Sequence, residues 1–264
     1  MTALITEQLA DAPIGAWPMQ DTAGTTMVDE SGNGRDGTYV NVTLGATAID
    51  NQGARSADFD GATSYATVAY AAWMAMTTFT VEVLVQADSV QPVGYSEICG
   101  QWQGPLVPGQ FRLMLDASSD TYAELSAGGT QHFQTPVTLS PTTDPYLLAV
   151  RYDGLNWSLF KNGVNVMDEP VTRTPTDAGN PALFIGHSGV NTGPYTGMWW
   201  NGRMSHLAWY DSALSDARLA AHAAASGTQY VNLAPSPGGV LTATASPRGR
   251  VKLGMSVSPD GGPP

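Results

Sequence analysis

Apolar and polar residues alternate along much of this chain with the period of two that is typical of β-strands. In residues 79–85 four apolar side chains share one parity, whereas Glu82 takes the opposite parity. Residues 146–152 repeat the pattern with two tyrosines, a leucine and a valine. Side chains of one parity share one face of a strand. Each segment is therefore predicted to turn one row of apolar side chains toward a core and the other row outward.

The clearest local signal is a hairpin over residues 157–166. Asn162-Gly163 interrupts the alternation there and readily supplies the two positive-φ residues of a type I′ turn. Further strands are predicted at residues 14–19, 38–42, 57–60, 65–68, 111–116, 122–126, 182–186 and 203–210. About a dozen short strands separated by turns predict an all-β fold, a two-sheet antiparallel jelly-roll sandwich.

Two short helices are also expected. Residues 4–10 form the first, with Thr2 as its N-cap. Residues 215–225 form the second, because Ser215 can cap the free amides at its start and Gly227 closes the run. The second helix ends the sandwich domain.

The chain is predicted to have three parts, which are an N-terminal segment (residues 1–12), a jelly-roll domain (13–227) and a Pro/Gly-rich tail (228–264). The tail holds two alternating stretches, residues 240–245 and 250–257, but about 35 residues bury little core alone. It also carries three cations, whereas the rest of the chain is strongly acidic. We expect a plain tail or an assembly arm, with Arg248, Arg250 and Lys252 as the docking charges of the arm. The alternative is that the three cations lie together by chance.

Charge and composition exclude several classes of protein. The formal net charge is −12, and nucleic-acid binding needs clustered cations, so no nucleic-acid partner is expected. The single cysteine, Cys99, excludes an intrachain disulfide. No run reaches the ~18 apolar residues of a membrane span. The first twelve residues carry no cation and no long apolar stretch, so we expect synthesis in a cytoplasm without a signal peptide.

Motifs for catalysis are incomplete. Residues 32–37 match G-x-G-x-x-G, but strand-like residues follow them instead of a helix. Residues 186–190 lack the last glycine of the G-x-S-x-G nucleophile elbow. A glycosidase needs two carboxyls about 5–10 Å apart, yet Glu82 and Glu124 are isolated within their predicted strands. We predict that the chain is not an enzyme.

The loop that begins at Asp29 is a candidate calcium site. Asp29, Ser31 and Asn33 place oxygen-bearing side chains at alternate positions, and the glycines among them let the chain wrap a hard cation. The loop does not match an EF-hand, because its twelfth position is Val40, where an EF-hand has a bidentate glutamate. The alternative is that these residues simply make tight turns.

Aromatic residues in or beside loops are the candidate sugar-binding residues, namely Trp102, Tyr195, Trp199 and Trp200. Exposed aromatic rings can stack on the apolar face of a sugar or on a protein partner. The alternative is that strand alternation puts one ring of the Trp199-Trp200 pair into the core and the other on the surface.

Several local patterns follow one another in an order that resembles the laminin G-like, concanavalin A-like lectin/glucanase jelly roll over residues 13–226. They lie at residues 13–19, 29–39, 59–61, 79–82, 150–154, 162–163 and 202–215. The resemblance implies two curved antiparallel sheets and usually a binding or structural module. Family members often hold calcium near the Asp29 loop with an acidic residue near the last strand, where this chain has Ser205-His206.

Similar modules, with an opening that looks like residues 9–17, occur in tailed-phage virion proteins. The resemblance implies a non-enzymatic virion protein, either a minor tail protein or a capsid decoration, that assembles as a homo-oligomer such as a trimer. Its tail would attach to other virion proteins, and its loops would contact host-surface carbohydrate. The alternative is a lectin-like carbohydrate-binding module outside a virion, and a third hypothesis is an enzyme of glucanase type.

Overall fold

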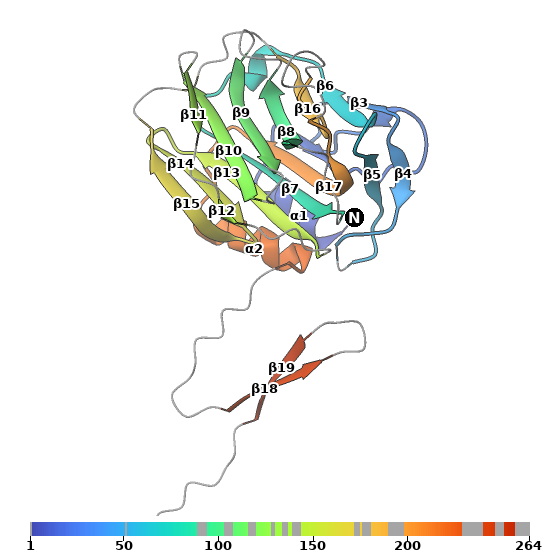
Figure 1. Ribbon diagram of the computed structural model, residues 1–264, viewed down its shortest axis with the longest axis vertical. Helices are drawn as coiled ribbons and strands as arrows, with labels where there is room; N and C mark the ends of the chain where they lie inside the picture. Colours follow the sequence, from blue (N-terminus) through green and yellow to red (C-terminus); the bar gives the residue numbers. More distant parts are fainter. Residues whose placement is uncertain are drawn as a thin grey trace, which may run out of the picture. The chain divides into compact units, whose positions relative to one another are not determined.

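Two antiparallel β-sheets pack face to face and enclose one large hydrophobic core between them (Figure 1). The computed structural model describes residues 2–50, 52–88, 94–102, 108–115, 120–127, 130–133, 137–138, 144–171, 175, 181–189, 198–228, 240–245 and 251–256. The chain divides into two compact units, Met1–Gln229 and Tyr230–Pro264, and the two sheets belong to the first unit. The predicted two-sheet antiparallel sandwich is confirmed.

The first sheet carries both α-helices on its outer side. Its strands run in the order β15-β14-β13-β7-β17-β5-β4, and β1 pairs with β17. Helix α1 (Ala3–Ala10) contacts β1 and β17, and helix α2 (Asp216–Ser226) contacts β13, β15 and α1. The strand bounds are β1 Gly15–Trp17, β4 Thr43–Ala46, β5 Ser56–Asp60, β7 Phe79–Ala87, β13 Tyr146–Tyr152, β14 Asn156–Lys161, β15 Val164–Pro170 and β17 Asn201–Tyr210.

The second sheet has the order β11-β10-β9-β8-β16-β6-β3-β2, and β12 pairs with β10. A short 3₁₀-helix, η1 (Ala72–Met74), connects β6 to β7. The strand bounds are β2 Thr26–Met27, β3 Gly37–Val40, β6 Tyr65–Val68, β8 Ser96–Trp102, β9 Pro108–Leu115, β10 Asp120–Ala127, β11 Thr130–Phe133, β12 Val137–Thr138 and β16 Leu183–Ile185.

Strand β7 shows where the alternation pattern succeeds and where it misleads. Its predicted inward row, Phe79, Val81, Val83 and Val85, lies in the core between the sheets. Glu82 points away from that core as expected, but its exposed fraction is 0%. The reason is that helices α1 and α2 cover the outer face of this sheet, so both faces of β7 are buried.

The predicted hairpin is confirmed as strands β14 and β15. Asn162 has a φ of 51° and Gly163 a φ of 77°, which are the two positive-φ positions of the expected turn. Gly163 is also needed for space, because a Cβ atom there would lie 2.7 Å from the Cα of Ala220 in helix α2. The turn therefore fits directly beneath the helix.

Both predicted helices are present. Ser215 accepts a hydrogen bond from the backbone N–H of Arg218 at the start of α2, and Gly227 ends the helix with a φ of 76°. Thr2 occupies the predicted N-cap position of α1, but its hydroxyl makes no cap hydrogen bond and instead lies 2.8 Å from Nε2 of His206. Residues 1–12, treated above as a separate N-terminal segment, fall within the same compact unit as the sandwich.

Strand β8 was not predicted, because Glu97, Gly100 and Gln101 break its apolar pattern. All seven of its residues are buried. Glu97 can lie inside because Nη2 of Arg112, on the neighbouring strand β9, contacts its Oε2 at 2.6 Å. Burial of a charge becomes tolerable when it is paired and hydrogen-bonded.

The second unit contains a hairpin of strands β18 (Val240–Ala245) and β19 (Val251–Ser256). Its strands match the alternating stretches expected in the tail. Lys252 faces Thr244 in the register of this hairpin, whereas Arg248 and Arg250 lie outside the described residues. None of the helices in the described ranges has the length and apolar character needed to cross a membrane.

Candidate functional site

The four aromatic residues predicted to bind sugar have different surroundings. Trp200 is 0% exposed and Trp102 is 2% exposed, so neither ring can stack on a ligand, and the prediction is wrong for both. Trp200 lies in the core, and the guanidinium carbon of Arg112 lies 4.0 Å from the ring centre of Trp102. Trp199 is only partly buried, and Tyr195 lies outside the described residues. The alternative, with one ring of the Trp199-Trp200 pair inside and one at the surface, is confirmed.

Trp199 belongs to a group of four rings that we call the aromatic face, formed by Tyr65, Phe184, His187 and Trp199. The rings of Trp199 and His187 are stacked, with centroids 3.8 Å apart and an interplanar angle of 25°. Tyr65 lies 6.3 Å from Trp199 and 6.4 Å from Phe184 between ring centroids. Tyr65, Phe184 and Trp199 are each partly exposed, so the group reaches solvent.

Strand alternation explains how these rings reach one surface. In β6 and β16 the inward positions are fully buried, whereas Tyr65 and Phe184 occupy the opposite, partly exposed parity. The two strands are paired, with Phe184 opposite Thr67. A single bridge between His187 and Trp199 then brings the tryptophan to the same place. Tyr65, Phe184 and His187 were not predicted as site residues, although the outward parity of β6 and β16 indicates the first two.

Two glycines fix the ring of His187. Gly186 and Gly189 have φ values of 80° and 70°, and a Cβ atom at Gly189 would come within 2.6 Å of the Phe184 ring. The backbone N–H of Gly189 donates to Nδ1 of His187 at 3.0 Å. Residues 186–189, part of the incomplete G-x-S-x-G motif, therefore form a tight turn that orients the imidazole of His187 against Trp199.

The candidate calcium loop is held together by its own hydrogen bonds. Each carboxylate oxygen of Asp29 accepts two of them, from the backbone N–H groups of Ala16, Ser31 and Arg35 and from the Ser31 hydroxyl, at 2.8–2.9 Å. Asn33 directs its amide N–H groups to backbone carbonyls and to Ser31. These hydrogen bonds are those of a tight turn, so they fit the alternative that Asp29, Ser31 and Asn33 serve the turn and not a cation. Across the described ranges, no group of three or more His, Cys, Asp and Glu side chains is arranged to hold a metal ion.

Ser205-His206, which stands where the family often has acidic residues, lies at an irregularity of β17. The register between β17 and β7 shifts after Ser205, and His206 has a φ of 54°. Its Nε2 atom lies 2.8 Å from the Thr2 hydroxyl and 3.1 Å from the amide nitrogen of Gln20. Burial lowers the pKa of His206 to about 4 against the opposing charges of Asp50 and Glu82, so the ring is neutral at pH 7.

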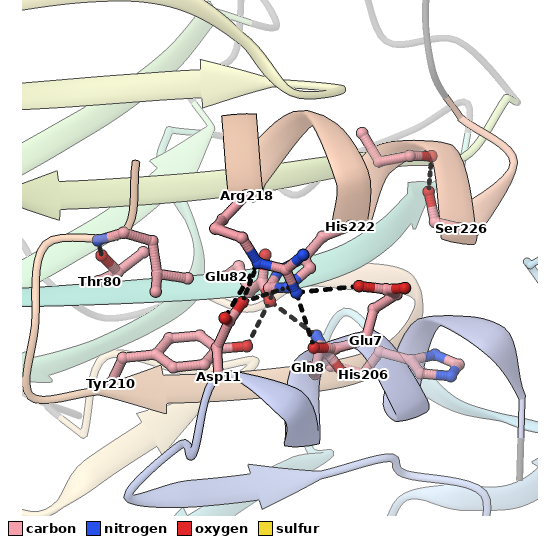
Figure 2. Close-up of polar contacts among 12 residues, drawn as sticks. Glu7, Gln8, Asp11, Thr80, Glu82, His206, Tyr210, Arg218, His222 and Ser226 are labelled. Carbon is pink, nitrogen blue, oxygen red and sulfur yellow. Dashed lines mark hydrogen bonds and ion pairs between the residues drawn. The ribbon is translucent and has the colours of Figure 1, made fainter. Parts of the chain in front are cut away.

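A buried polar cluster lies between the two α-helices and the first sheet, and Figure 2 shows its side chains converging from α1, α2, β7 and β17. Oε1 of Glu82 accepts hydrogen bonds from Gln8 at 3.0 Å and from the Tyr210 hydroxyl at 2.8 Å. The same oxygen lies 2.8 Å from Nδ1 of His222. On the other side of the imidazole, Nε2 lies 2.9 Å from Oδ2 of Asp11.

Arg218 completes the connection between the helices (Figure 2). Its Nε atom donates to both carboxylate oxygens of Asp11 at 2.8 and 2.9 Å, and Nη2 contacts Oε2 of Glu7 at 2.9 Å. One arginine of α2 thus binds a carboxylate of α1 and the carboxylate of its C-cap residue, Asp11. The side chains of these surface partners are 17–42% exposed, so solvent weakens the ion pairs and the buried contacts matter more.

Burial and the neighbouring carboxylates shift the pKa values of two donors in this cluster. Burial lowers the pKa of His222, but the charges of Glu82 and Asp11 and the hydrogen bond to Glu82 outweigh it, so the pKa lies above its ordinary value. Burial, followed by the charge and hydrogen bond of Glu82, raises the pKa of Tyr210 well above 10. Glu82 and Asp11 face one another, but the imidazole stands between them and Glu82 is fully buried, which leaves no space for a sugar.

Comparison with known proteins shows the family to which the sandwich belongs. Residues 60–220 match the sequence model of the concanavalin A-like lectin/glucanases superfamily. No curated protein matches the chain.

Several solved structures share the fold at low sequence identity. The binding domain of Paraclostridial Mosquitocidal Protein 1 has a TM-score of 0.66 and 11% identity, and the match covers 94% of this chain and 65% of that one. A structure of botulinum neurotoxin type C, whose cell entry depends on interaction with two ganglioside molecules, has a TM-score of 0.60 and 10% identity, with 87% and 54% covered. This chain therefore spans less than two thirds of either protein.

A third structure is matched almost over its whole length. Domain 4 of AbnA, an extracellular arabinanase from Geobacillus stearothermophilus solved with arabinotriose, has a TM-score of 0.56 and 17% identity, with 80% of this chain and 98% of that chain covered.

Proposed function

Because the chain belongs to the concanavalin A-like lectin/glucanases superfamily, we propose that it is a non-enzymatic carbohydrate-binding protein. The observation that carries this proposal is the aromatic face, in which Trp199 stacks on a fixed His187 ring and remains partly exposed beside Tyr65 and Phe184. Aromatic rings are large, rigid and partly apolar, so they bind the apolar faces of sugar rings with little loss of side-chain entropy.

The structural neighbours support a binding role. They include a toxin binding domain, a neurotoxin whose cell entry depends on gangliosides, and an arabinanase domain in complex with arabinotriose. The two facing carboxylates of the polar cluster are separated by His222, which also favours binding over glycoside hydrolysis.

Substitution of Trp199 tests this role. Trp199→Ala should lower the affinity for a bound glycan about 5- to 150-fold, if a sugar ring gains as much from one aromatic side chain as a stacked nucleobase does, about 1–3 kcal/mol. Trp199→Phe keeps an aromatic ring and should retain most of the binding. Leu155→Ala, at a 72% exposed residue in the β13–β14 turn, is the control for loss of a surface apolar side chain. Equal affinity of Trp199→Ala and the wild type would exclude the aromatic face as the site.

We further propose that the protein belongs to a bacteriophage virion, as a minor tail protein or capsid decoration, and acts there as a homo-oligomer. The support is the sequence resemblance together with a separate C-terminal unit that contains its own β-hairpin. In this proposal the C-terminal unit joins the protein to other virion proteins, and the sandwich binds carbohydrate on the host surface.

Light scattering on the full chain and on a variant that ends at residue 228 tests the assembly role. We expect an oligomer that becomes monomeric on truncation, because symmetric assembly is the norm for such components. Mass spectrometry of purified virions tests the location. A monomer in both forms together with absence from the virions would contradict this proposal and leave the isolated carbohydrate-binding module.

A further inference from the structure

We propose that a second pocket, formed by Arg35, Trp73 and Asp211, binds a neutral sugar residue, an inference that rests on the proposed carbohydrate-binding function. The pocket has a volume of about 420 Å³, within the range of roughly 300–1,000 Å³ that is usual for small-molecule sites. It is formed where the start of β1, the Asp29 loop, η1 and the turn after β17 meet. Its lining residues are Ile14, Arg35, Trp73, Ala75, Met76, Thr77, Thr78 and Asp211.

Arg35 supplies hydrogen-bond donors to this pocket. Its guanidinium carbon lies 4.1 Å from the centre of the Trp73 ring, and Nη1 donates to the carbonyl oxygen of Ile14. In the described part of the chain Arg35 forms no ion pair, so its remaining N–H groups have no carboxylate partner. A guanidinium held over an indole presents its donors from a rigid, planar group.

Asp211 supplies acceptors to the same pocket. The residue is exposed, and its carboxylate makes no hydrogen bond or ion pair with the described residues. Burial lowers the pKa of Arg35, and the charges of Asp29 and Asp211 oppose this shift, so Asp211 lies within electrostatic range of the guanidinium. The pocket therefore offers unpaired donors and unpaired acceptors to one ligand.

This combination selects the class of ligand. A sugar hydroxyl both donates and accepts a hydrogen bond, so neighbouring hydroxyls can satisfy the carboxylate of Asp211 and the guanidinium of Arg35 together. A carboxylate or phosphate would gain from Arg35 but would be repelled by Asp211 and by the net charge of −12. Trp73 adds an aromatic ring beside these polar groups. A neutral sugar fits all three side chains, whereas an acidic sugar fits two.

The walls of the pocket are held in place before any ligand binds. Oδ2 of Asp29 accepts the backbone N–H of Arg35 at 2.9 Å, so the turn discussed above as a calcium candidate positions this arginine. The Thr78 hydroxyl donates to the carbonyl oxygen of Asp211 at 3.3 Å. Trp73 meets the buried ring of Trp209 edge to face, with centroids 5.5 Å apart. Binding to such a site costs little ordering entropy.

A buried side chain of the core holds the Met76 backbone, which lines the pocket. Gln110, which is 2% exposed and lies on β9, accepts the backbone N–H of Met76 at 2.9 Å and donates to its carbonyl oxygen. A buried side chain thus pins the segment between η1 and β7.

Protein NMR with simple sugars tests the assignment on the full chain. The probes are the methyl glycosides of glucose, galactose, mannose and N-acetylglucosamine, with glucuronic acid and N-acetylneuraminic acid as the acidic comparison. The indole N–H signal of Trp73, identified with a Trp73→Phe variant, should shift saturably with at least one neutral glycoside. Asp211→Ala should weaken that titration about tenfold, since a hydrogen bond to a charged group contributes about 1.5–3 kcal/mol. Glu30→Ala removes an exposed carboxylate outside this pocket and should change nothing.

The outcomes separate this inference from the proposed function. Shifts confined to Trp199 and its neighbours would overturn the second pocket and leave carbohydrate binding intact. A Trp73 shift with an acidic sugar alone, or one that Asp211→Ala leaves unchanged, would overturn the neutral-sugar assignment. An absence of shifts at Trp73 with every sugar would also overturn it, whereas the proposed function is decided by glycan binding at Trp199.

Discussion

Nδ1 of His222 lies 2.8 Å from Oε1 of Glu82, and both side chains are fully buried between helix α2 and strand β7. This contact connects the outer face of the first sheet to the helices that cover it. Removal of the shared acceptor from a buried hydrogen-bond network leaves its donors unpaired away from water, at about 1–3 kcal/mol for each donor. The contact is therefore expected to contribute strongly to the attachment of the helices.

Glu82→Ala should lower the free energy of unfolding by about 3–5 kcal/mol, since it leaves Gln8, Tyr210 and His222 without their shared acceptor. Urea denaturation followed by circular dichroism measures the change. Glu30→Ala, at an exposed glutamate, is the matched control and should stay within about 0.5 kcal/mol of the wild type. A loss below about 1 kcal/mol for Glu82→Ala would mean that the cluster does not hold the helices.

The lowered pKa of His206 predicts that the free energy of unfolding decreases in acid. Its folded-state pKa of about 4 lies below the ordinary value of 6.5, so the unfolded chain takes up this proton first as the pH falls. Stability must then decrease from pH 6.5 to pH 4, by about 3 kcal/mol in total. The pKa of His222 is shifted in the opposite direction, and its contribution is fully present below its unfolded pKa, so it is constant across this window.

The variant His206→Asn should remove this part of the pH dependence. Asparagine does not titrate and tolerates the positive φ of 54° at this position. Urea denaturation at several pH values between 6.5 and 4 compares the two slopes. Identical slopes for the variant and the wild type would show that His206 is not the group responsible.

Calcium should not stabilise the protein. All four acceptor positions of the Asp29 carboxylate are used by N–H and O–H donors of the chain. We expect the melting temperature to be the same in excess calcium and in EDTA, because a bound ion would stabilise the folded state by mass action. Asp29→Ala should cost about 1–3 kcal/mol, since it leaves buried N–H groups unpaired. A melting temperature that rises with calcium concentration in the wild type but not in Asp29→Ala would restore the metal site.

The two adjacent tryptophans should respond differently to truncation. Trp200→Ala removes a fully buried ring and should cost about 3–5 kcal/mol. Trp199→Ala removes a partly exposed ring and should cost clearly less. Thermal unfolding of both variants measures the difference. Equal losses would indicate that Trp199 serves the core instead of the surface.

The sequence was sufficient for most of the strands and for the hairpin at Asn162-Gly163, because alternation and turn chemistry act locally. It was insufficient where a distant partner changes the meaning of a residue. Glu82 was expected to face solvent, but helices from both ends of the sandwich domain cover it. Strand β8 was missed because Glu97 breaks its apolar pattern, and the ion pair with Arg112 that makes its burial tolerable cannot be seen in the local sequence.

The candidate site was partly predictable for the same reason. Adjacent positions such as Trp199 and Trp200 must take opposite faces, but the sequence does not say which one faces the core. Gly186 and Gly189 were noted as parts of a catalytic motif, and only the fold gives them the role of orienting His187. The pocket of Arg35 and Asp211 joins residues from distant parts of the sequence, which no local pattern could reveal.

Binding of the fluorescently labelled wild-type protein to a glycan array tests the central claim most directly. We predict binding to at least one class of glycan, with competition by the corresponding free sugar and a weaker signal in Trp199→Ala. An array without any bound glycan, obtained with protein that circular dichroism shows to be folded, would contradict the carbohydrate-binding function.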